Sequence, residues 1–256
     1  MSLKPHVEGS VYRQFHAKDG LGLTMGQKLA VWGVHGLTMS GVIWACLAMI
    51  SLAHGELKAM WAWLGVAILV DGVDGTLARR YDVKNRAPWF DGTTLDMIVD
   101  FITWTLIPAL FMYLHLPLGP KPLAMAMMIL VCISSVFCYC NTGMKASDNY
   151  FVGFPAAWNA VAVYLWLMGT GAVVNIALTV TFAVLTLAPV AFVHPFRVRH
   201  LMVVNLLAVG LWFFALVWLV ASYPDGPLPV WIVLWAASLW LAGIGVWRTF
   251  AGARES

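Results

Sequence analysis

Residues 58–79 begin as an apolar run and end in a short acidic pattern, KAMWAWLGVAILVDGVDGTLAR. The first thirteen of these residues carry a single charge, on Lys58, whereas Asp71, Asp74 and Arg79 all fall in the last nine. A membrane-spanning helix needs about 20 mostly apolar residues, and the stretch has this length. It therefore predicts a transmembrane helix with two carboxylates near one end.

The composition of the whole chain agrees with a membrane protein. Of the 256 residues, 61% are hydrophobic and only 11% are charged, whereas about 25% are charged in an ordinary soluble domain. Apolar runs recur from about Ala30 to Phe250 without a gap the size of a soluble domain. We expect one all-α integral membrane domain. The net charge of +3 is mild and gives no reason to expect nucleic-acid binding.

About eight transmembrane helices are expected, with an interfacial helix before them. Residues 1–27 mix charged and apolar side chains without the compact apolar core of a cleavable signal, which predicts an N-terminal amphipathic segment on the membrane surface. Residues 28–256 form the membrane domain. Its predicted spans are 30–53, 58–79, 92–115, 122–144, 153–169, 172–193, 201–222 and 228–249.

Lysine and arginine predict which side of the membrane each loop faces. With eight spans both termini share a side, and that side receives thirteen of the fifteen basic residues, all except Lys58 and Lys121. Cytoplasmic loops carry the excess of positive charge. We therefore expect both termini and the loop at 79–86 to face the cytoplasm.

Four aspartates lie inside the predicted spans. Asp71 and Asp74 are three residues apart in the second span, and Asp96 and Asp100 are four apart in the third. Either spacing puts both side chains on one helix face. A carboxylate at membrane depth costs about 2.5–3.5 kcal/mol on insertion scales, so four of them imply a compensating partner. The short loop between the two spans lets the helices lie antiparallel with the four acids together.

Such an all-oxygen cluster suits Mg²⁺ or Mn²⁺ better than zinc. Spacing alone leaves two alternatives open, a solvated acidic vestibule and a proton-coupled transporter site. Gly75 and Ala78 lie on the same face as Asp71 and Asp74 and leave room for a flat ring or a phosphate, and Arg79 can pair with a phosphate oxygen. This combination favours a site for a phosphoanhydride.

The pattern Asp71-x-x-Asp74-Gly75-x-x-Ala78-Arg79, then Gly92-x-x-x-Asp96-x-x-x-Asp100, resembles the signature of the CDP-alcohol phosphotransferase family. The chain departs from the family in two places. Twelve residues separate Arg79 from Gly92, more than is usual, and His35 stands where many members have asparagine. Both departures, and the stretches 88–92, 153–159 and 194–199, resemble one subgroup, the bacterial phosphatidylcholine synthases.

The resemblance implies a displacement reaction assisted by two divalent ions, Mn²⁺ or Mg²⁺. The choline hydroxyl attacks the diacylglycerol-bearing phosphorus of CDP-diacylglycerol and CMP leaves, while the ions stabilise the attacked and departing oxygens. The implied metal ligands are Asp71, Asp74, Asp96 and Asp100, of which Asp96 and Asp100 are catalytic and Asp100 is the general base. The implied contacts to the CDP and lipid phosphates are Gly75, Ala78, Arg79, Thr38, Arg197 and Arg199.

Three of the remaining roles have a plain structural alternative. Arg197 and Arg199 either bind phosphate or anchor the chain as positive-inside residues, and His35 is either a headgroup contact or a hydrogen-bonded histidine between helices. A quaternary ammonium group is bound by aromatic faces and a nearby carboxylate. The choline-binding candidates near the cytoplasm are Trp104, Tyr139, Tyr150, Phe154 and Trp158, with Asp148 and Asn159 as polar partners, and the alternative for each of them is a packing or interfacial-belt residue.

Other acceptors and another class of protein remain as alternatives. The acceptor alcohol can be serine, inositol or glycerol phosphate, although few basic residues are available for an anionic one. A cation-coupled transporter would use the acids as ion ligands, but transporters commonly contain inverted repeats, and none is visible. The resemblance further implies a bacterial inner membrane location, a cytoplasmic active site and a homodimer.

Overall fold

The computed structural model describes residues 23–252 and is a bundle of helices with one short pair of strands. The predicted interfacial segment 1–27 falls mostly outside these described residues. The all-α prediction is confirmed for the described part of the chain.

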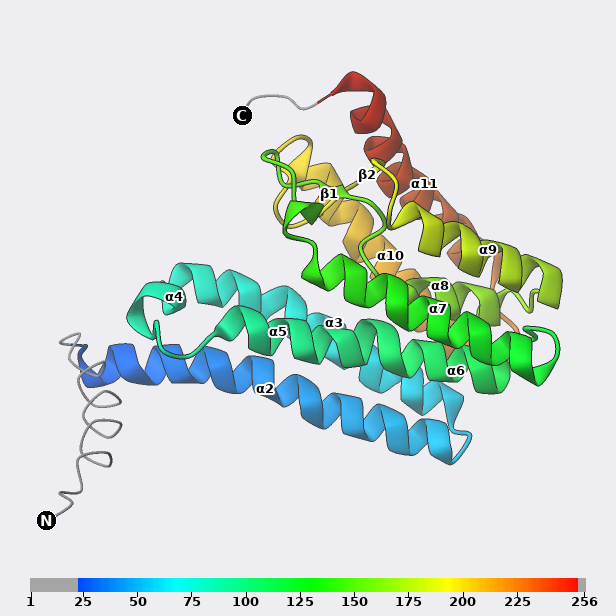
Figure 1. Ribbon diagram of the computed structural model, residues 1–256, viewed down its shortest axis with the longest axis horizontal. Helices are drawn as coiled ribbons and strands as arrows, with labels where there is room; N and C mark the ends of the chain where they lie inside the picture. The colour runs from blue at the N-terminus through cyan, green and yellow to red at the C-terminus, as the bar shows by residue number, and fades with distance from the viewer. Residues whose placement is uncertain (1–22, 253–256) are drawn as a thin grey trace, which may run out of the picture.

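The first half of the chain forms one group of helices, which lies along one side of the bundle (Figure 1). Helix α2 packs along α3 for much of its length, and α5 packs against α2. The short helix α4 lies in the loop at the end of α3, on the side where α5 begins (Figure 1). The elements of this group are α2 (Met25–Ala53), α3 (Leu57–Arg80), α4 (Val83–Arg86), α5 (Gly92–Asp100), a π-helical segment (Phe101–Leu106) and α6 (Ile107–His115).

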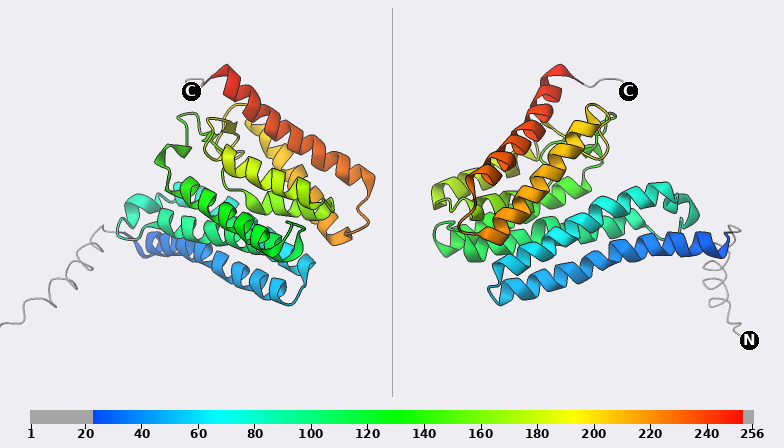
Figure 2. Two further views of the ribbon diagram at one scale, coloured as in Figure 1. Left: turned by 45° about the vertical axis from the view of Figure 1, so that its right-hand side comes forward. Right: turned by 180° about the vertical axis from the view of Figure 1, so that it is seen from behind.

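The second half of the chain packs on this group. Helix α7 contacts α6 and α9, α10 contacts α3, and α11 lies beside α10, as both views of Figure 2 show. The fully buried side chains of Phe111 and Trp158 belong to the main apolar core, to which both groups contribute. The elements of this second group are α7 (Lys121–Cys140), a 3₁₀ turn (Thr142–Met144), β1 (Phe151–Val152), α8 (Trp158–Leu167), α9 (Ala172–Leu185), β2 (Ala191–Phe192), α10 (Met202–Ser222) and α11 (Leu228–Ala251).

The third predicted span is one continuous helix with a widened turn in its middle. The π-helical segment begins directly after Asp100 and is followed by Pro108 in the first turn of α6. Proline has no N–H to donate and its ring collides with the carbonyl four residues earlier, here that of Trp104. A π turn relieves this conflict by changing the hydrogen-bond register, and such turns are frequent at functional sites.

Six helices in the described region are long and apolar enough to cross a membrane, and they coincide with six of the eight predicted spans. The other two expected spans contain α8 and α9, which have ten and fourteen residues. At a rise of about 1.5 Å per residue these helices are about 15 and 21 Å long, shorter than the ~30 Å hydrocarbon core. The structure thus supports a multi-pass helical membrane protein with six spans and two shorter apolar helices.

The segment before α8 and the segment after α9 are not helical; they contain two short strands that pair with each other. Strand β1 pairs antiparallel with β2, and the N–H groups of Gly153 and Phe154 donate to the carbonyls of Val190 and Leu185. Gly153 has φ +94, and a side chain there would collide with the carbonyl oxygen of Thr186. Hydropathy counts these apolar residues as parts of spans, but the glycine permits a tight crossing, so that α8 begins late and α9 ends early.

Candidate active site

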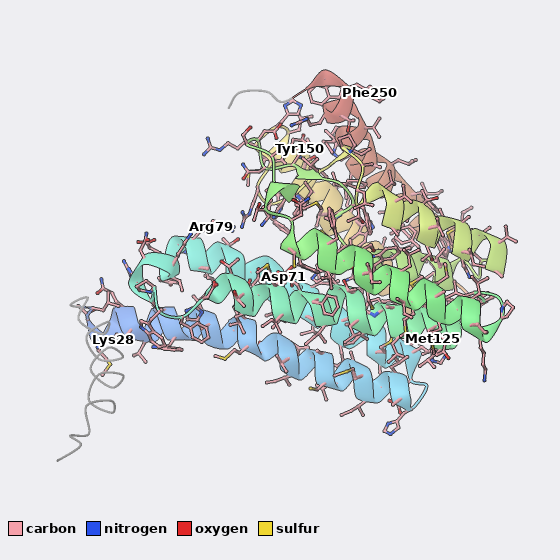
Figure 3. All side chains as sticks on the ribbon, viewed as in Figure 1. Lys28, Asp71, Arg79, Met125, Tyr150 and Phe250 are labelled. Carbon is pink, nitrogen blue, oxygen red and sulfur yellow. The ribbon has the colours of Figure 1, made fainter. Side chains whose placement is uncertain are left out.

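Three of the four predicted acids meet between two helices. One carboxylate oxygen each from Asp71, Asp96 and Asp100 can be chosen so that all three atoms lie within 4.8 Å of one another. Asp71 comes from α3 and the other two from successive turns of α5, and all three side chains are partly buried. Asp71 lies where α3, α5 and the C-terminal end of α7 come together (Figure 3). Three carboxylates this close are able to hold a metal ion among them.

Asp74 stands beside this cluster and has a partner of its own. Its side chain is only 4% exposed and interacts with Thr38 of α2 and with Arg79 one turn later on α3. It also lies within electrostatic range of Asp71, Asp96 and Asp100. The structure therefore brings all four predicted acids to one site, with three facing one another and Asp74 turned toward α2.

Small residues let the helices of the site approach closely. A Cβ on Gly92 would come within 2.9 Å of the His35 imidazole, and one on Gly41 would collide with Val99. Both glycines lie at the contact between α2 and α5. They allow α2 to pack directly on the helix that carries Asp96 and Asp100.

His35 is buried in this contact rather than open to solvent. Its side chain is 2% exposed, its ring centroid lies 4.5 Å from that of Phe90, and its Nε2 has no hydrogen-bond partner among the described residues. The structure thus places His35 between helices, as the structural alternative predicted. The hydrogen bond that this alternative also predicted is not made by Nε2 to any described residue.

The predicted phosphate contacts on α3 lie around Arg79. The Arg79 guanidinium donates a hydrogen bond to the Thr76 hydroxyl over 3.1 Å, and a Cβ added to Gly75 would approach Nη1 of Arg79 to 3.4 Å. Ala78 is partly buried against the small apolar cluster of Val31, Val34, Val83 and Ala87. The absence of a side chain on Gly75 thus leaves the Arg79 side chain free to fold back toward Asp74.

Basic side chains from distant segments surround the acids. Burial, and then the positive charge of Arg197, lower the pKa of Lys145, which also interacts with Asp96, Asp100 and Asp71. Arg197 interacts with Arg79 as well, and its Nε is buried without a hydrogen-bond partner among the described residues. Such a buried donor, flanked by further cations, is suited to an anionic oxygen of a ligand.

Burial and the same cations lower the pKa of the His194 imidazole. Burial first, and then Arg197, Lys145 and Arg79, lower the pKa of His194 to about 4. The imidazole is therefore neutral at neutral pH, and the positive charge at the site comes from the lysine and the two arginines. Arg199 is exposed, whereas Arg197 is partly buried and Val198 between them is buried.

Lys145 is not among the site residues predicted from the sequence. It lies five residues after the end of α7, in the turn that leads to β1, and the backbone of Lys145 forms an isolated bridge with Phe151. In the sequence it is one basic residue among those assigned to the cytoplasmic side. Only the return of this loop onto α5 brings its amine to the carboxylates.

The predicted choline-binding residues fall into two groups. Tyr139 interacts electrostatically with Asp100 and Asp71 and packs edge-on against Phe101, with 6.2 Å between the ring centroids. Trp104 is partly exposed one turn beyond Asp100.

The other predicted choline-binding side chains are packed elsewhere. Trp158 is 0% exposed, Phe154 packs on it with 5.3 Å between the ring centroids, and Asn159 is 3% exposed. The Tyr150 ring faces the Arg248 guanidinium at 5.7 Å, and Asp148 forms a salt bridge with the same arginine.

The pair between Asp148 and Arg248 gives a prediction on stability. Arg248 Nε donates to Asp148 Oδ2 over 2.7 Å, with 10–15% of either side chain exposed. Replacing Asp148 with alanine leaves the arginine without its partner and is expected to cost about 3 kcal/mol. Thermal unfolding in detergent, compared with Asp225→Ala at an exposed aspartate, measures the loss. An Asp148→Ala protein of unchanged stability and raised choline KM would instead assign Asp148 to choline binding.

An α-helical membrane bundle with clustered carboxylates, surrounded by lysine and arginine side chains, has the arrangement of an integral-membrane enzyme of phosphate chemistry. No protein-family model matches the chain. The chain is 45% identical over 230 residues to the phosphatidylcholine synthase of Pseudomonas aeruginosa, covering 90% of this chain and 96% of that protein. The chain belongs to the phosphatidylcholine synthase family.

Two further relatives support the same assignment. The phosphatidylcholine synthase of Brucella melitensis is 37% identical over 201 residues, which cover 78% of this chain and 72% of the relative. That of Bradyrhizobium diazoefficiens is 36% identical over 229 residues, with 88% and 84% covered. The similarity extends over most of the chain and is not confined to the acidic pattern.

Proposed function

We propose that the protein is a phosphatidylcholine synthase that transfers the phosphatidyl group of CDP-diacylglycerol to choline and releases CMP. Membership of the family supports this assignment. The observation that carries it on the structural side is the convergence of Asp71, Asp96 and Asp100 from two helices. A cation-coupled transporter does not account for the ring of arginine and lysine around the acids.

The residues of the cluster fit a divalent cation. Carboxylate oxygens are the donors that Mg²⁺ and Mn²⁺ prefer, and three of them lie within 4.8 Å of one another. We assign Asp71, Asp96 and Asp100 as the principal ligands, with Asp74 as the fourth acid, for two divalent ions. When bound, these ions stabilise negative charge on the phosphoryl oxygens and on the departing CMP.

The chain's own residues hold the two substrates and move one proton. Arg79, Lys145 and Arg197 bind the diphosphate, Gly75 and Ala78 leave room for CMP, and Thr38 keeps Asp74 in place. Asp100 accepts the proton of the choline hydroxyl as the new P–O bond forms, and the P–O bond to CMP breaks with its electron pair. Positioning and charge stabilisation then supply most of the rate acceleration.

Choline recognition centres on Tyr139 and Trp104. The Tyr139 side chain interacts with Asp100 and Asp71, and Trp104 follows one turn after Asp100, near where the trimethylammonium group of an attacking choline has to be. Replacing Tyr139 with alanine is expected to raise the choline KM about 2–30-fold, the equivalent of a cation–π contact of about 0.5–2 kcal/mol.

The matched control for this prediction is Tyr139→Phe, which keeps the ring and should keep the KM. Initial rates at varied choline and saturating CDP-diacylglycerol measure it. A KM equally raised by both substitutions, or by neither, would remove Tyr139 from the choline site.

The membrane arrangement follows the distribution of charge. We propose that α8 and α9, extended by their flanking segments, complete eight crossings, so that both termini and the site face the cytoplasm of a bacterial inner membrane. Residues 28–256 form this enzyme domain, with 71–100 as its catalytic segment. We further propose a homodimer, as the resemblance of the acidic pattern implies.

CMP release tests the proposed function directly. Purified protein is given CDP-diacylglycerol, Mn²⁺ and, in turn, choline, serine, inositol or glycerol phosphate. Choline-dependent release with formation of phosphatidylcholine is expected. Release only with one of the other alcohols would identify a different transferase, and a protein inactive with all of them would contradict the assignment.

A further inference from the structure

A long apolar cavity extends along α3 from near Asp71 toward the start of the helix. Its volume is about 620 Å³ and it lies between α3, α8 and α10, with a lining that is apolar except at its ends. Pockets of about 300–1,000 Å³ hold most of a small ligand's surface. None of the four acids lines it, so it is a separate space from the metal cluster.

One end of the cavity is next to the acids. Leu69, which lines it, lies two residues before Asp71 on α3. Asn159, at the start of α8, also lines it, and α8 packs against the π-helical segment that follows Asp100. A molecule whose phosphate is held at the carboxylates can therefore enter the cavity from this end.

The other end lies at the far side of the bundle, near the start of α3. Lys58 lines the cavity there, and its amine donates a hydrogen bond to the carbonyl of Ala221 over 3.1 Å, so it joins α3 to α10. From Leu69 to Lys58 the cavity follows eleven residues of α3, which rise about 16 Å. Half of the ~30 Å hydrocarbon core, the depth that one acyl chain occupies in a leaflet, is about 15 Å.

Asn159 supplies the polar contact that a glycerolipid needs at the entrance. Its side chain is 3% exposed, and its Nδ2 has no hydrogen-bond partner among the described residues, although its Oδ1 accepts from the Ala160 N–H. A buried donor without a partner is costly. The ester carbonyl of a diacylglycerol lies just below the phosphate and is an acceptor for it.

We propose that this cavity holds one acyl chain of CDP-diacylglycerol, with its ester carbonyl on Asn159, and that its depth sets which chain lengths are used. The inference rests on the proposed function, because it takes the phosphate of the same lipid to be at the carboxylates. The length of the cavity, its apolar lining and the unpartnered Asn159 amide at the end nearest the acids all match an esterified fatty acid.

Gly65 gives the sharpest test because it lines the middle of the cavity. It lies six residues before Asp71, about 9 Å along the helix, and a Cβ there meets only Phe213, at 3.8 Å. Gly65→Leu should therefore fill the cavity below the reach of an octanoyl chain. Its kcat/KM for CDP-dioleoylglycerol should fall about 10–200-fold, whereas that for CDP-dioctanoylglycerol should stay within about twofold of wild type.

Ala62 provides a graded second variant. It lines the cavity nine residues before Asp71, about 14 Å along the helix. Ala62→Phe should therefore discriminate against oleoyl chains but tolerate lauroyl chains, which Gly65→Leu does not. Gly210→Leu is the matched control, since Gly210 lies on α10, is exposed, does not line the cavity, and has no atom within 4 Å of an added Cβ.

The outcomes separate the two proposals. A wild-type protein without choline-dependent CMP release on either lipid contradicts the proposed function itself. Wild-type activity combined with an unchanged ratio of long-chain to short-chain kcat/KM in both cavity variants overturns the acyl-chain assignment alone, and would leave the cavity to another membrane lipid. If Gly65→Leu loses activity on both lipids through misfolding, the ratio in Ala62→Phe decides.

Discussion

Asp100→Asn is expected to lower turnover by about 10²–10⁴-fold, the usual contribution of a general base. The substitution keeps the size of the side chain and its place directly before the π-helical segment, but an amide cannot accept the proton of choline. It also removes one negative charge from a cluster of three carboxylates. Binding of CDP-diacylglycerol should change little, because Arg79, Lys145 and Arg197 keep their charges.

The measurement is single-turnover CMP release at saturating substrates, with CDP-diacylglycerol affinity measured separately. Asp225→Asn, at an exposed aspartate in the loop between α10 and α11, is the control and should behave as wild type. Wild-type turnover in the Asp100→Asn protein would refute the assignment of the base. A large loss of substrate affinity at normal turnover would assign Asp100 to binding only.

Asp71→Ala is expected to abolish metal-supported activity, by about 10³-fold or more, because bound metal contributes several kcal/mol of charge stabilisation to phosphoryl transfer. Asp71 is the only member of the facing triad that α3 contributes. Without it, both remaining members of the facing triad lie on α5, and α3 offers only Asp74, whose side chain interacts with Thr38 instead of facing the triad. The Mn²⁺ concentration for half-maximal residual activity should therefore rise as turnover falls.

Titration of the variant with Mn²⁺ at fixed choline and CDP-diacylglycerol makes this measurement. Asp82→Ala is a suitable control, because Asp82 is an exposed acid at the end of the same helix and outside the cluster. An Asp71→Ala enzyme with the wild-type metal dependence would show that the ions are held elsewhere.

Much of the site was predictable because the bilayer makes aspartate costly. A carboxylate in an apolar run costs free energy in the membrane, so its presence indicates a function. Helical periodicity then indicates which side chains share a face. The spacings of Asp71, Asp96 and Asp100 thus predicted their meeting. The turn of Asp74 toward Thr38 was not predictable, because it depends on how closely α2 approaches through Gly41 and Gly92.

The helical periodicity of the sequence does not predict contacts between segments that are distant along the chain. Lys145 reaches the acids through an irregular loop, and no local pattern distinguishes it from a basic residue that only anchors the chain. Hydropathy likewise overestimated the lengths of α8 and α9, since it records that residues 151–157 and 186–193 are apolar but not that Gly153 lets them pair as strands. The choline assignments rested on residue type alone, and the structure packs Trp158 and Asp148 into other contacts.

Crystals of the protein grown with Mn²⁺ and CDP-diacylglycerol offer the most direct test of where the metal lies. An anomalous difference map recorded at the manganese absorption edge should show density among the side-chain oxygens contributed by α3 and α5. Active protein whose map is empty at that position, with manganese bound elsewhere or nowhere, would contradict the two-helix metal centre and the mechanism built on it.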